Sequence, residues 1–183
     1  MPANIEIKAV LKNRAAALAC AARLADSGPE IIHQEDIFFR CEGARLKLRI
    51  FHSDDGDSTH GELIRYQREN RADARCSHYS IAHTSDPCIL LDILTKTLGV
   101  VGTVRKTRTL YLVGQTRIHI DQVEGLGDFL ELEVVLREGQ TEEEGKRIAN
   151  TLLAEFKIDE QDLIAGAYVD LLAARTPEPT SSS

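Results

Sequence analysis

Residues 118–133 read IHIDQVEGLGDFLELE, and this stretch alternates between apolar and charged side chains on both sides of a glycine-containing turn. His119 and Asp121 share one face before the turn, and Glu131 and Glu133 share one face after it. Because side chains two residues apart lie on the same face of a strand, the pattern predicts two strands, each with a charged face and an aliphatic face.

The same alternation marks segments elsewhere in the chain, at NIEIKAVL, RLKLRIF and VRKTRTLYLV. Helical patterns with capping residues lie between the strands; Thr141 and Glu144, for example, predict a capping box. Strands are expected at residues 4–11, 33–39, 45–51, 62–68, 77–83, 104–113, 116–123 and 129–136, and helices at 13–26, 86–98, 141–156 and 159–174.

Strands therefore outnumber helices, and most consecutive strands can be joined by short turns, such as the one at Gly114-Gln115. This order predicts an α+β fold, in which an antiparallel sheet or β-barrel is flanked by helices. The 183 residues contain no boundary signal, so we expect a single domain over residues 1–174. The terminal RTPEPTSSS, residues 175–183, is expected to be a disordered, solvated tail.

Composition excludes several classes of protein. Lys and Arg number 22 against 29 Asp and Glu, a formal charge of −7, which disfavours general nucleic-acid binding. No apolar run approaches the roughly 18 residues of a membrane span, and the N-terminus does not resemble a signal peptide. The four cysteines are dispersed, without zinc-ligand spacing. We therefore expect a cytoplasmic protein with no membrane or nucleic-acid partner.

The charged strand faces have two interpretations. An open antiparallel sheet would expose them to water and pair opposite charges across strands. A closed barrel would instead turn them inward, where cations and carboxylates together suit a polyanion held with a divalent metal. Segregation of the charges favours the barrel, since residues 45–51 and 104–113 carry cations and residues 129–136 carry carboxylates. The chain has no P-loop motif.

At these residues the sequence resembles the CYTH superfamily, the triphosphate tunnel metalloenzymes, and is most similar to its class IV adenylate cyclase-like branch. Residues 4–8, NIEIK, stand where that family has its E-x-E-x-K motif. Residues 33–39, 46–49, 104–111 and 118–133 are similar to the later strands of the family, in the same order. The resemblance covers about residues 4–172 and implies a tunnel-like antiparallel β-barrel with the charged faces inside.

The resemblance also implies roles for individual residues. Arg45 would be a charge at the rim, and Tyr168 is similar to a recurrent aromatic residue of the final helix, which we interpret as a packing residue. The cations expected to bind substrate phosphates are Lys8, Lys47, Arg49, Arg68, Lys106 and Arg108. The ligands expected for Mg²⁺ or Mn²⁺ are Glu6, Asp121, Glu131 and Glu133, of which Glu6, Glu131 and Glu133 are also expected to be catalytic.

Asn4 departs from the family pattern, because an amide stands where the first glutamate of the motif belongs. An amide oxygen can bind a metal, but it adds no negative charge. A site for two metals, and a full catalytic rate, are therefore in question.

These observations favour a divalent-metal-dependent enzyme that acts on the triphosphate of a small molecule. Hydrolysis of an inorganic, thiamine or nucleoside triphosphate is the preferred interpretation. The alternative is a class IV adenylate cyclase, which converts ATP to cyclic AMP and pyrophosphate. A module that binds triphosphate or polyphosphate without turnover is a second alternative. A homodimer is compatible with all three of these functions.

Overall fold

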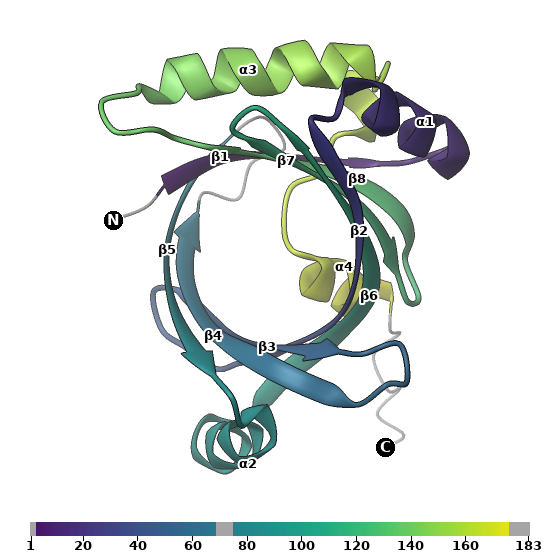
Figure 1. Ribbon diagram of the computed structural model, residues 1–183. Coiled ribbons are helices and arrows are strands. Elements are labelled where there is room, and N and C mark those ends of the chain that lie inside the picture. Colours follow the sequence, from purple (N-terminus) through teal and green to yellow (C-terminus); the bar gives the residue numbers. More distant parts are fainter. Residues whose placement is uncertain (1–2, 69–74, 176–183) are drawn as a thin grey trace, which may run out of the picture.

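In the computed structural model, which describes residues 3–68 and 75–175, eight antiparallel strands close into a ring (Figure 1). The order around the ring is β1-β5-β4-β3-β2-β6-β7-β8, and β8 pairs with β1 to close it. The strands are β1 (Ala3–Val10), β2 (Ser27–Phe39), β3 (Arg45–His52), β4 (Ser58–Arg68), β5 (Arg75–Thr84), β6 (Val100–Val113), β7 (Thr116–Val123) and β8 (Gly127–Val135). The predicted α+β class and antiparallel barrel are confirmed.

The register of the closing strands determines which charges meet inside the ring. β1 and β8 are antiparallel, with Glu6 opposite Glu133 and Lys8 opposite Glu131. Residues opposite one another in register share a face of the sheet. The aliphatic faces of both strands point outward, where Ile7 and Leu132 are buried beneath helices.

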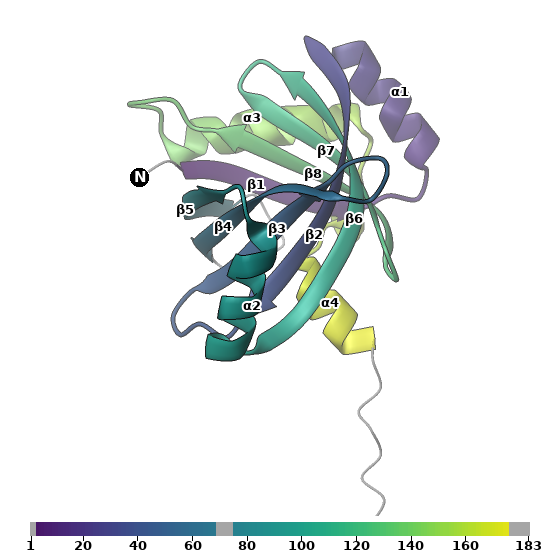
Figure 2. The same ribbon diagram turned by 60° about the horizontal axis from the view of Figure 1, so that its bottom comes forward.

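Three helices cover the outside of the ring in two places (Figures 1 and 2). α1 (Arg14–Leu24) and α3 (Glu142–Glu155) pack on the apolar face of β1, β7 and β8, and α2 (Pro87–Leu98) packs on β2, β3 and β4. The side chains of Asn13, Asp86 and Thr141 accept hydrogen bonds from the first turns of these helices, and Thr141 and Glu144 form the predicted capping box.

The expected final helix over residues 159–174 is wrong in part. A single 3₁₀ turn, η1 (Glu160–Asp162), is followed by an extended segment and then by α4 (Tyr168–Arg175). The extended segment is held on β1, where Ile164 N–H donates to Lys8 C=O at 2.9 Å. Gly166 then turns the chain with φ +79°, which an L-residue rarely adopts. The predicted helix is therefore interrupted between η1 and α4, where the chain crosses β1 to reach one end of the barrel.

The first residues of α4 fill that end of the ring. Ala167 and Tyr168 are buried in a cluster with Phe38, Val104 and Phe129, which come from three different strands. Arg45 fixes the helix with a bidentate hydrogen-bonded ion pair to Asp170, at 3.0 and 2.7 Å. Arg175, expected in the tail, is the last residue of α4; residues 176–183 lie outside the described part of the chain.

Within residues 3–68 and 75–175, no helix is both long enough and apolar enough to cross a membrane.

Gly145 sets how closely α3 approaches β1, the strand that carries Asn4, Glu6 and Lys8. A Cβ at this position would lie 2.6 Å from carbon atoms of both Ile5 and Leu136. We expect Gly145→Ala to lower the free energy of unfolding by about 1–3 kcal/mol in urea titrations, because this overpacking outweighs the gain in helix propensity. Asn150→Ala on the exposed side of α3 should leave stability unchanged or raise it. Equal stabilisation by both substitutions would contradict the close packing.

Candidate active site

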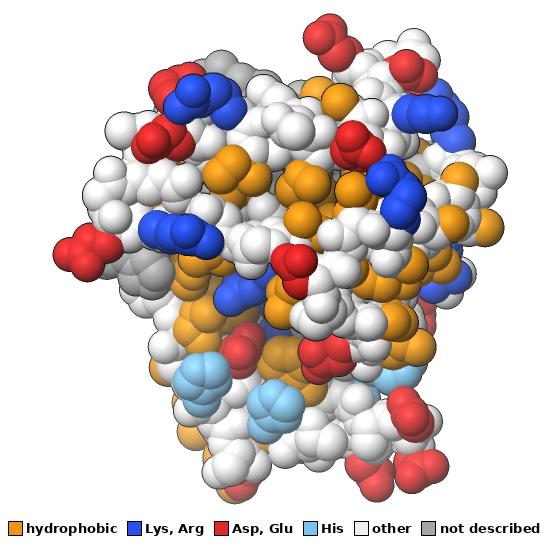
Figure 3. All heavy atoms as spheres, turned by 45° about the horizontal axis from the view of Figure 1, so that its top comes forward, with side chains coloured by type: hydrophobic (Ala, Val, Ile, Leu, Met, Phe, Trp, Pro, Cys, Tyr) orange, Lys and Arg blue, Asp and Glu red, His pale blue; other side chains and the backbone are white. Residues whose placement is uncertain are grey.

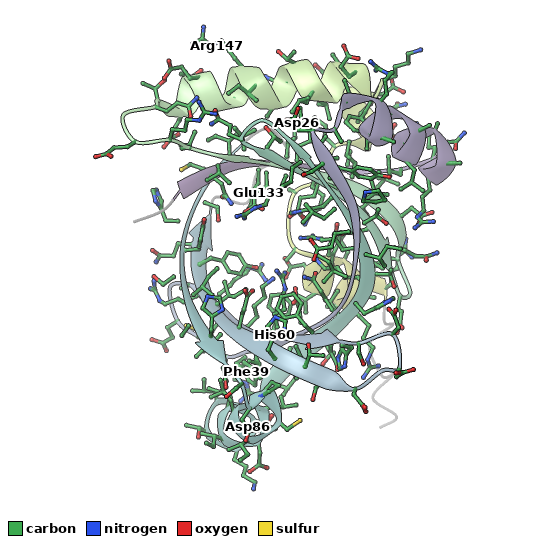
Figure 4. All side chains as sticks on the ribbon, in the orientation of Figure 1. Asp26, Phe39, His60, Asp86, Glu133 and Arg147 are labelled. Atoms are coloured by element: carbon green, nitrogen blue, oxygen red, sulfur yellow. The ribbon has the colours of Figure 1, made fainter. Side chains whose placement is uncertain are left out.

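A cavity of about 500 Å³ occupies the inside of the ring, and all eight strands contribute to its wall. Figure 3 shows Lys and Arg side chains within a hollow of the surface, and Figure 4 places Glu133 and His60 on opposite walls of the ring. The open, solvated sheet is thereby excluded. Eight of the predicted site residues line this one cavity: Glu6, Lys8, Lys47, Arg49, Lys106, Arg108, Glu131 and Glu133.

The other two predicted site residues have different positions. Asp121 is fully buried beneath Arg108 and Tyr168 on the inner face of β7 and does not line the cavity; both of its carboxylate oxygens accept hydrogen bonds. Arg68 is the last residue of β4 and pairs in register with Ser77, but its side chain lies outside the described part of the structure.

Asp121 on β7 holds two cations of β6. Arg108 donates to it from Nε at 2.6 Å and from Nη2 at 2.7 Å, and Lys106 Nζ lies 3.4 Å away. The Tyr168 hydroxyl donates to the same carboxylate at 3.0 Å. Burial raises the pKa of Asp121, but Arg108 and then Lys106 outweigh it and hold this pKa well below its ordinary value. Asp121 is therefore an internal counter-ion.

Asp36 on β2 does the same for two cations of β3. Lys47 Nζ lies 2.7 Å from its carboxylate, and Arg49 donates from Nε at 2.7 Å and from Nη2 at 3.0 Å. Burial raises the pKa of Asp36, but Arg49 and Lys47 more than compensate, so its pKa lies well below the ordinary value. The two carboxylates thus each hold a Lys-x-Arg pair in a fixed position inside the barrel.

Both lysines of these pairs lose proton affinity inside the barrel. Burial, followed by the charge of Arg49, lowers the pKa of Lys47 to about 8. Burial and then Arg108 lower the pKa of Lys106 to about 7. Near neutral pH, part of the Lys106 population is therefore uncharged.

Glu131 on β8 lies among basic side chains from three strands. Lys8 Nζ is 3.0 Å from its carboxylate and Arg108 Nη2 is 3.7 Å away. His119 Nδ1 lies at 3.5 Å, and burial, followed by the charge of Arg108, lowers the pKa of His119. Burial raises the pKa of Glu131, but Lys8 and then His119 and Arg108 hold it well below the ordinary value, so this carboxylate is ionised at neutral pH.

Lys8 also lies over the face of an aromatic ring. Its Nζ is 4.0 Å from the centroid of Tyr168, within the range of a cation–π contact. Because the Tyr168 hydroxyl reaches Asp121, one side chain contacts the charged groups of both β1 and β7. Tyr168 therefore supports the floor of the site, a role beyond the packing expected from the sequence.

Glu133, Glu6 and Asn4 form an oxygen-rich group on the neighbouring part of the wall. Asn4 Nδ2 donates a short hydrogen bond to Glu133, and Arg117 lies 3.3 Å from the same carboxylate. Glu6 is opposite Glu133 in register. Asn4 is 1% exposed, and its Oδ1 is buried without a hydrogen-bond partner. This orphaned acceptor is suited to a cation or to a water that a cation holds.

These side chains suit a Mg²⁺ ion that keeps waters and substrate phosphates as ligands better than a metal enclosed entirely by protein ligands. Among the described residues, no group of three or more His, Cys, Asp or Glu side chains is already arranged around a metal-sized site. Mg²⁺ is typically bound by one or two carboxylates, with substrate phosphates and waters completing its shell. Glu6 and Glu133, with Asn4 Oδ1 beside them, supply a donor set of that kind.

Sequence reasoning missed Asp36, Gln34 and Glu62, which also line the cavity. The signal for the first two was present, because Gln34, Asp36 and Phe38 alternate on one face of residues 33–39. Asp36 is the acidic side chain on that face, and the structure buries it.

The CYTH domain family matches residues 2–168, so the chain belongs to the CYTH family. A search of curated protein sequences found no match.

Solved structures share the fold. The PH1012 protein from Pyrococcus horikoshii OT3 is similar with a TM-score of 0.81 and 22% identity, covering 92% of this chain and 99% of that one. A candidate adenylate cyclase from Vibrio parahaemolyticus has a TM-score of 0.71 and 21% identity, with coverage of 93% and 97%. A candidate adenylyl cyclase from Hippeastrum, described as having a dominant triphosphatase activity, has a TM-score of 0.64 and 17% identity, with both chains fully covered.

The lysine pKa values predict how polyanion binding depends on pH. A bound polyanion favours the charged ammonium, so binding draws protons onto Lys106 and Lys47, whose pKa values are about 7 and about 8 in the free protein. We expect affinity for tripolyphosphate to fall as pH rises through this range. Calorimetry in buffers of different ionisation enthalpy should detect proton uptake. Lys106→Arg, which stays charged, should weaken the pH dependence. Binding of tripolyphosphate without proton uptake at pH 7–8 would contradict this prediction.

Asp36→Asn should destabilise the fold, because it leaves Lys47 and Arg49 as buried cations without their carboxylate. Removing one partner of a buried ion pair costs about 3–5 kcal/mol, to be measured as the change in free energy of unfolding in urea. Asp92→Asn removes an exposed carboxylate that pairs with Lys96 on α2, and should change stability by less than about 1 kcal/mol. Similar effects of the two substitutions would show that Asp36 is not a structural counter-ion.

Proposed function

We propose that the protein hydrolyses a small-molecule triphosphate with the help of a divalent cation. The observation that carries the proposal is the convergence of two Lys-x-Arg pairs, from β3 and β6, on a cavity whose β1–β8 wall carries Glu6, Glu131 and Glu133. Guanidinium and ammonium groups bind phosphate oxygens, and carboxylates suit hard cations.

The charge balance of the cavity is the reason for a metal. Among the described residues of its wall, the cations are Lys8, Lys47, Arg49, Lys106, Arg108 and Arg117, and the acids are Glu6, Asp36, Glu62, Glu131 and Glu133. A triphosphate therefore brings much more negative charge than the wall has positive charge to spare. Binding it with a divalent cation supplies the missing charge, at the carboxylates that would otherwise repel the phosphates.

The residues would divide the work by position. Arg49 and Arg108, held by Asp36 and Asp121, would bind and orient phosphate oxygens without first having to become ordered. Lys8, Lys47 and Lys106 would add charge around them. Glu6 and Glu133, with Asn4 Oδ1, would hold the cation, which supplies Lewis-acid polarisation of a phosphate oxygen when bound.

In hydrolysis, the oxygen of a water attacks the terminal phosphorus while the bond from that phosphorus to the bridging oxygen breaks. The products are orthophosphate and a diphosphate, and the proton of the water passes to a phosphate product or to solvent. Carboxylates on the β1–β8 wall would orient this water, and the cations would stabilise charge on the departing diphosphate. Because Asp121 is occupied by Arg108, Lys106 and Tyr168, we place the cation away from it.

Two alternatives use the same cavity. Cyclisation of ATP would require the ribose 3′-oxygen to attack the α-phosphorus and release pyrophosphate; the similarity to a candidate adenylate cyclase favours it. Binding without turnover is favoured by Asn4, which adds no charge at the motif position. Hydrolysis is preferred because it needs only the proposed triphosphate site, without contacts to a ribose or base, and because the similar Hippeastrum protein is described as having a dominant triphosphatase activity.

The decisive experiment measures phosphate release from tripolyphosphate, thiamine triphosphate and ATP in Mg²⁺ or Mn²⁺, with cyclic AMP and pyrophosphate assayed in parallel. Metal-dependent orthophosphate release supports hydrolysis. Cyclic AMP with equimolar pyrophosphate would support the cyclase instead. Tight binding with neither product would support the binding module.

Glu133→Gln should separate metal-dependent turnover from phosphate binding. The change removes a negative charge from the group proposed to hold the cation, while the Lys-x-Arg pairs remain. We expect the rate of phosphate release to fall at least about tenfold, a loss of roughly 1.4 kcal/mol or more, while tripolyphosphate affinity measured in EDTA falls little or rises. Glu138→Gln, on an exposed loop, is the matched control. An unchanged rate in Glu133→Gln would remove this residue from the site.

A further inference from the structure

We infer that the outer face of the barrel carries a second cation site, which binds a transition-metal dication such as Zn²⁺ through His33, His52 and Glu35. The inference is independent of the proposed function, because none of these three side chains lines the cavity inside the ring. They line a separate groove of about 560 Å³, formed by β2, β3, β6 and β7 and by the turns that follow β3 and β7.

Strand register brings the two histidines together. His33 on β2 and His52 on β3 are opposite one another in an antiparallel pair, and Glu35 follows His33 by two residues on β2. Opposite residues share a face of the sheet with their Cβ atoms about 4.5–5.5 Å apart, and residues two apart on a strand share it as well. Because Gln34 and Asp36 line the inner cavity, this face is the outer one.

Hydrogen bonding determines which nitrogen of His52 is available to a metal. Its Nδ1 lies 3.2 Å from the carbonyl oxygen of Gly56, which is only an acceptor, so Nδ1 carries the hydrogen. In the neutral ring Nε2 therefore presents its lone pair, and this atom faces Glu35 Oε2 at 3.6 Å. Two acceptors that face each other repel unless a cation lies between them.

The distance favours a metal ion over a shared proton. The 3.6 Å between His52 Nε2 and Glu35 Oε2 is too long for a hydrogen bond. Two ligands held by a tetrahedral Zn²⁺ at about 2.0–2.1 Å from the ion lie about 3.3–3.4 Å apart, so only a small movement is needed to bind one.

His33 has a similar arrangement. Its Nδ1 lies 3.2 Å from Thr107 Oγ1 on β6, and its Nε2 lies 3.5 Å from Asp54 Oδ1 in the turn after β3. A histidine that binds a metal almost always forms a hydrogen bond through its other ring nitrogen, which holds the ring in place. Thr107 and Gly56 supply that second contact to the two histidines.

The charge of the groove also favours a cation. Its carboxylates are Glu35, Asp54 and Glu124. Arg105 contacts one of them, through Glu35 Oε1 at 2.8 Å, and the Lys106 ammonium lies beside Asp121 inside the ring. Imidazole and carboxylate together suit Zn²⁺, Ni²⁺ or Cu²⁺, whereas Mg²⁺ prefers oxygen ligands alone.

The last ligand is brought in by side-chain rotation. Among the described residues, no three His, Cys, Asp or Glu side chains already surround a metal-sized point. The side chains of His33 and His52 are 38% and 25% exposed, so both rings can turn toward a shared ion without disturbing the core. Water or Asp54 would complete the shell.

The test measures Zn²⁺ binding by calorimetry on the full chain, after removal of metals with EDTA and desalting. Excess Mg²⁺ is present to occupy sites made of oxygen ligands, such as the one proposed inside the ring. His83 on β5 is the matched control, because its Nδ1 also lies 3.6 Å from a carboxylate, that of Glu62. Its partner in register on β4 is Glu62 itself and not a second histidine.

We expect one Zn²⁺ to bind per chain and to raise the melting temperature, because only the folded sheet brings the ligands together. His33→Ala, His52→Ala and Glu35→Gln should each weaken Zn²⁺ binding about tenfold or more, and Thr107→Val, which keeps the ligands, about tenfold. His83→Ala should leave Zn²⁺ affinity unchanged. Melting of the metal-free variants checks that each is folded.

Three results would overturn the inference: no Zn²⁺ binding in excess Mg²⁺, unchanged binding in any of the three ligand variants, or an equal loss in His83→Ala. Because Zn²⁺ affinity is measured and turnover is not, each of these results leaves the proposed function standing.

Discussion

Two buried carboxylates make the interior of this barrel possible. Asp36 and Asp121 stand on β2 and β7, beside the strands that carry the Lys-x-Arg pairs, and each accepts hydrogen bonds from the arginine of its pair. Without them, four cations would share a cavity from which water is partly excluded, at a large cost in desolvation and repulsion. With them, the cations are held in one geometry while still lining the cavity.

The closed sheet separates the charged groups by position around the ring. Cations dominate the part formed by β3 and β6, and oxygen donors gather where β1 meets β8. Because each strand alternates, the same residues that charge the inside leave an aliphatic outside, which α1, α2 and α3 cover in two separate clusters. These three helices thus hold the wall from outside, and among the helices that the structure describes only α4 contributes a side chain to the lining of the cavity.

Much of this arrangement could be predicted, since alternation is a property of the sequence. The strict period in residues 4–11, 45–51 and 118–133 places side chains on a face, and closure decides that this face is the inner one. Pairing across strands is different, because it depends on register. Asp121 alternates with His119 just as a metal ligand would, but its position opposite Arg108 commits it to that guanidinium. The break in the last helix likewise depends on contacts with β1 that are distant in sequence.

Ala167 and Tyr168 pack into one end of the ring and line the cavity there. Under the proposed function, a substrate that entered from the other end would reach these two residues last, so its leading group would lie against them. For a triphosphate with its terminal phosphate foremost, the proposed cleavage would leave orthophosphate deeper in the ring than the diphosphate.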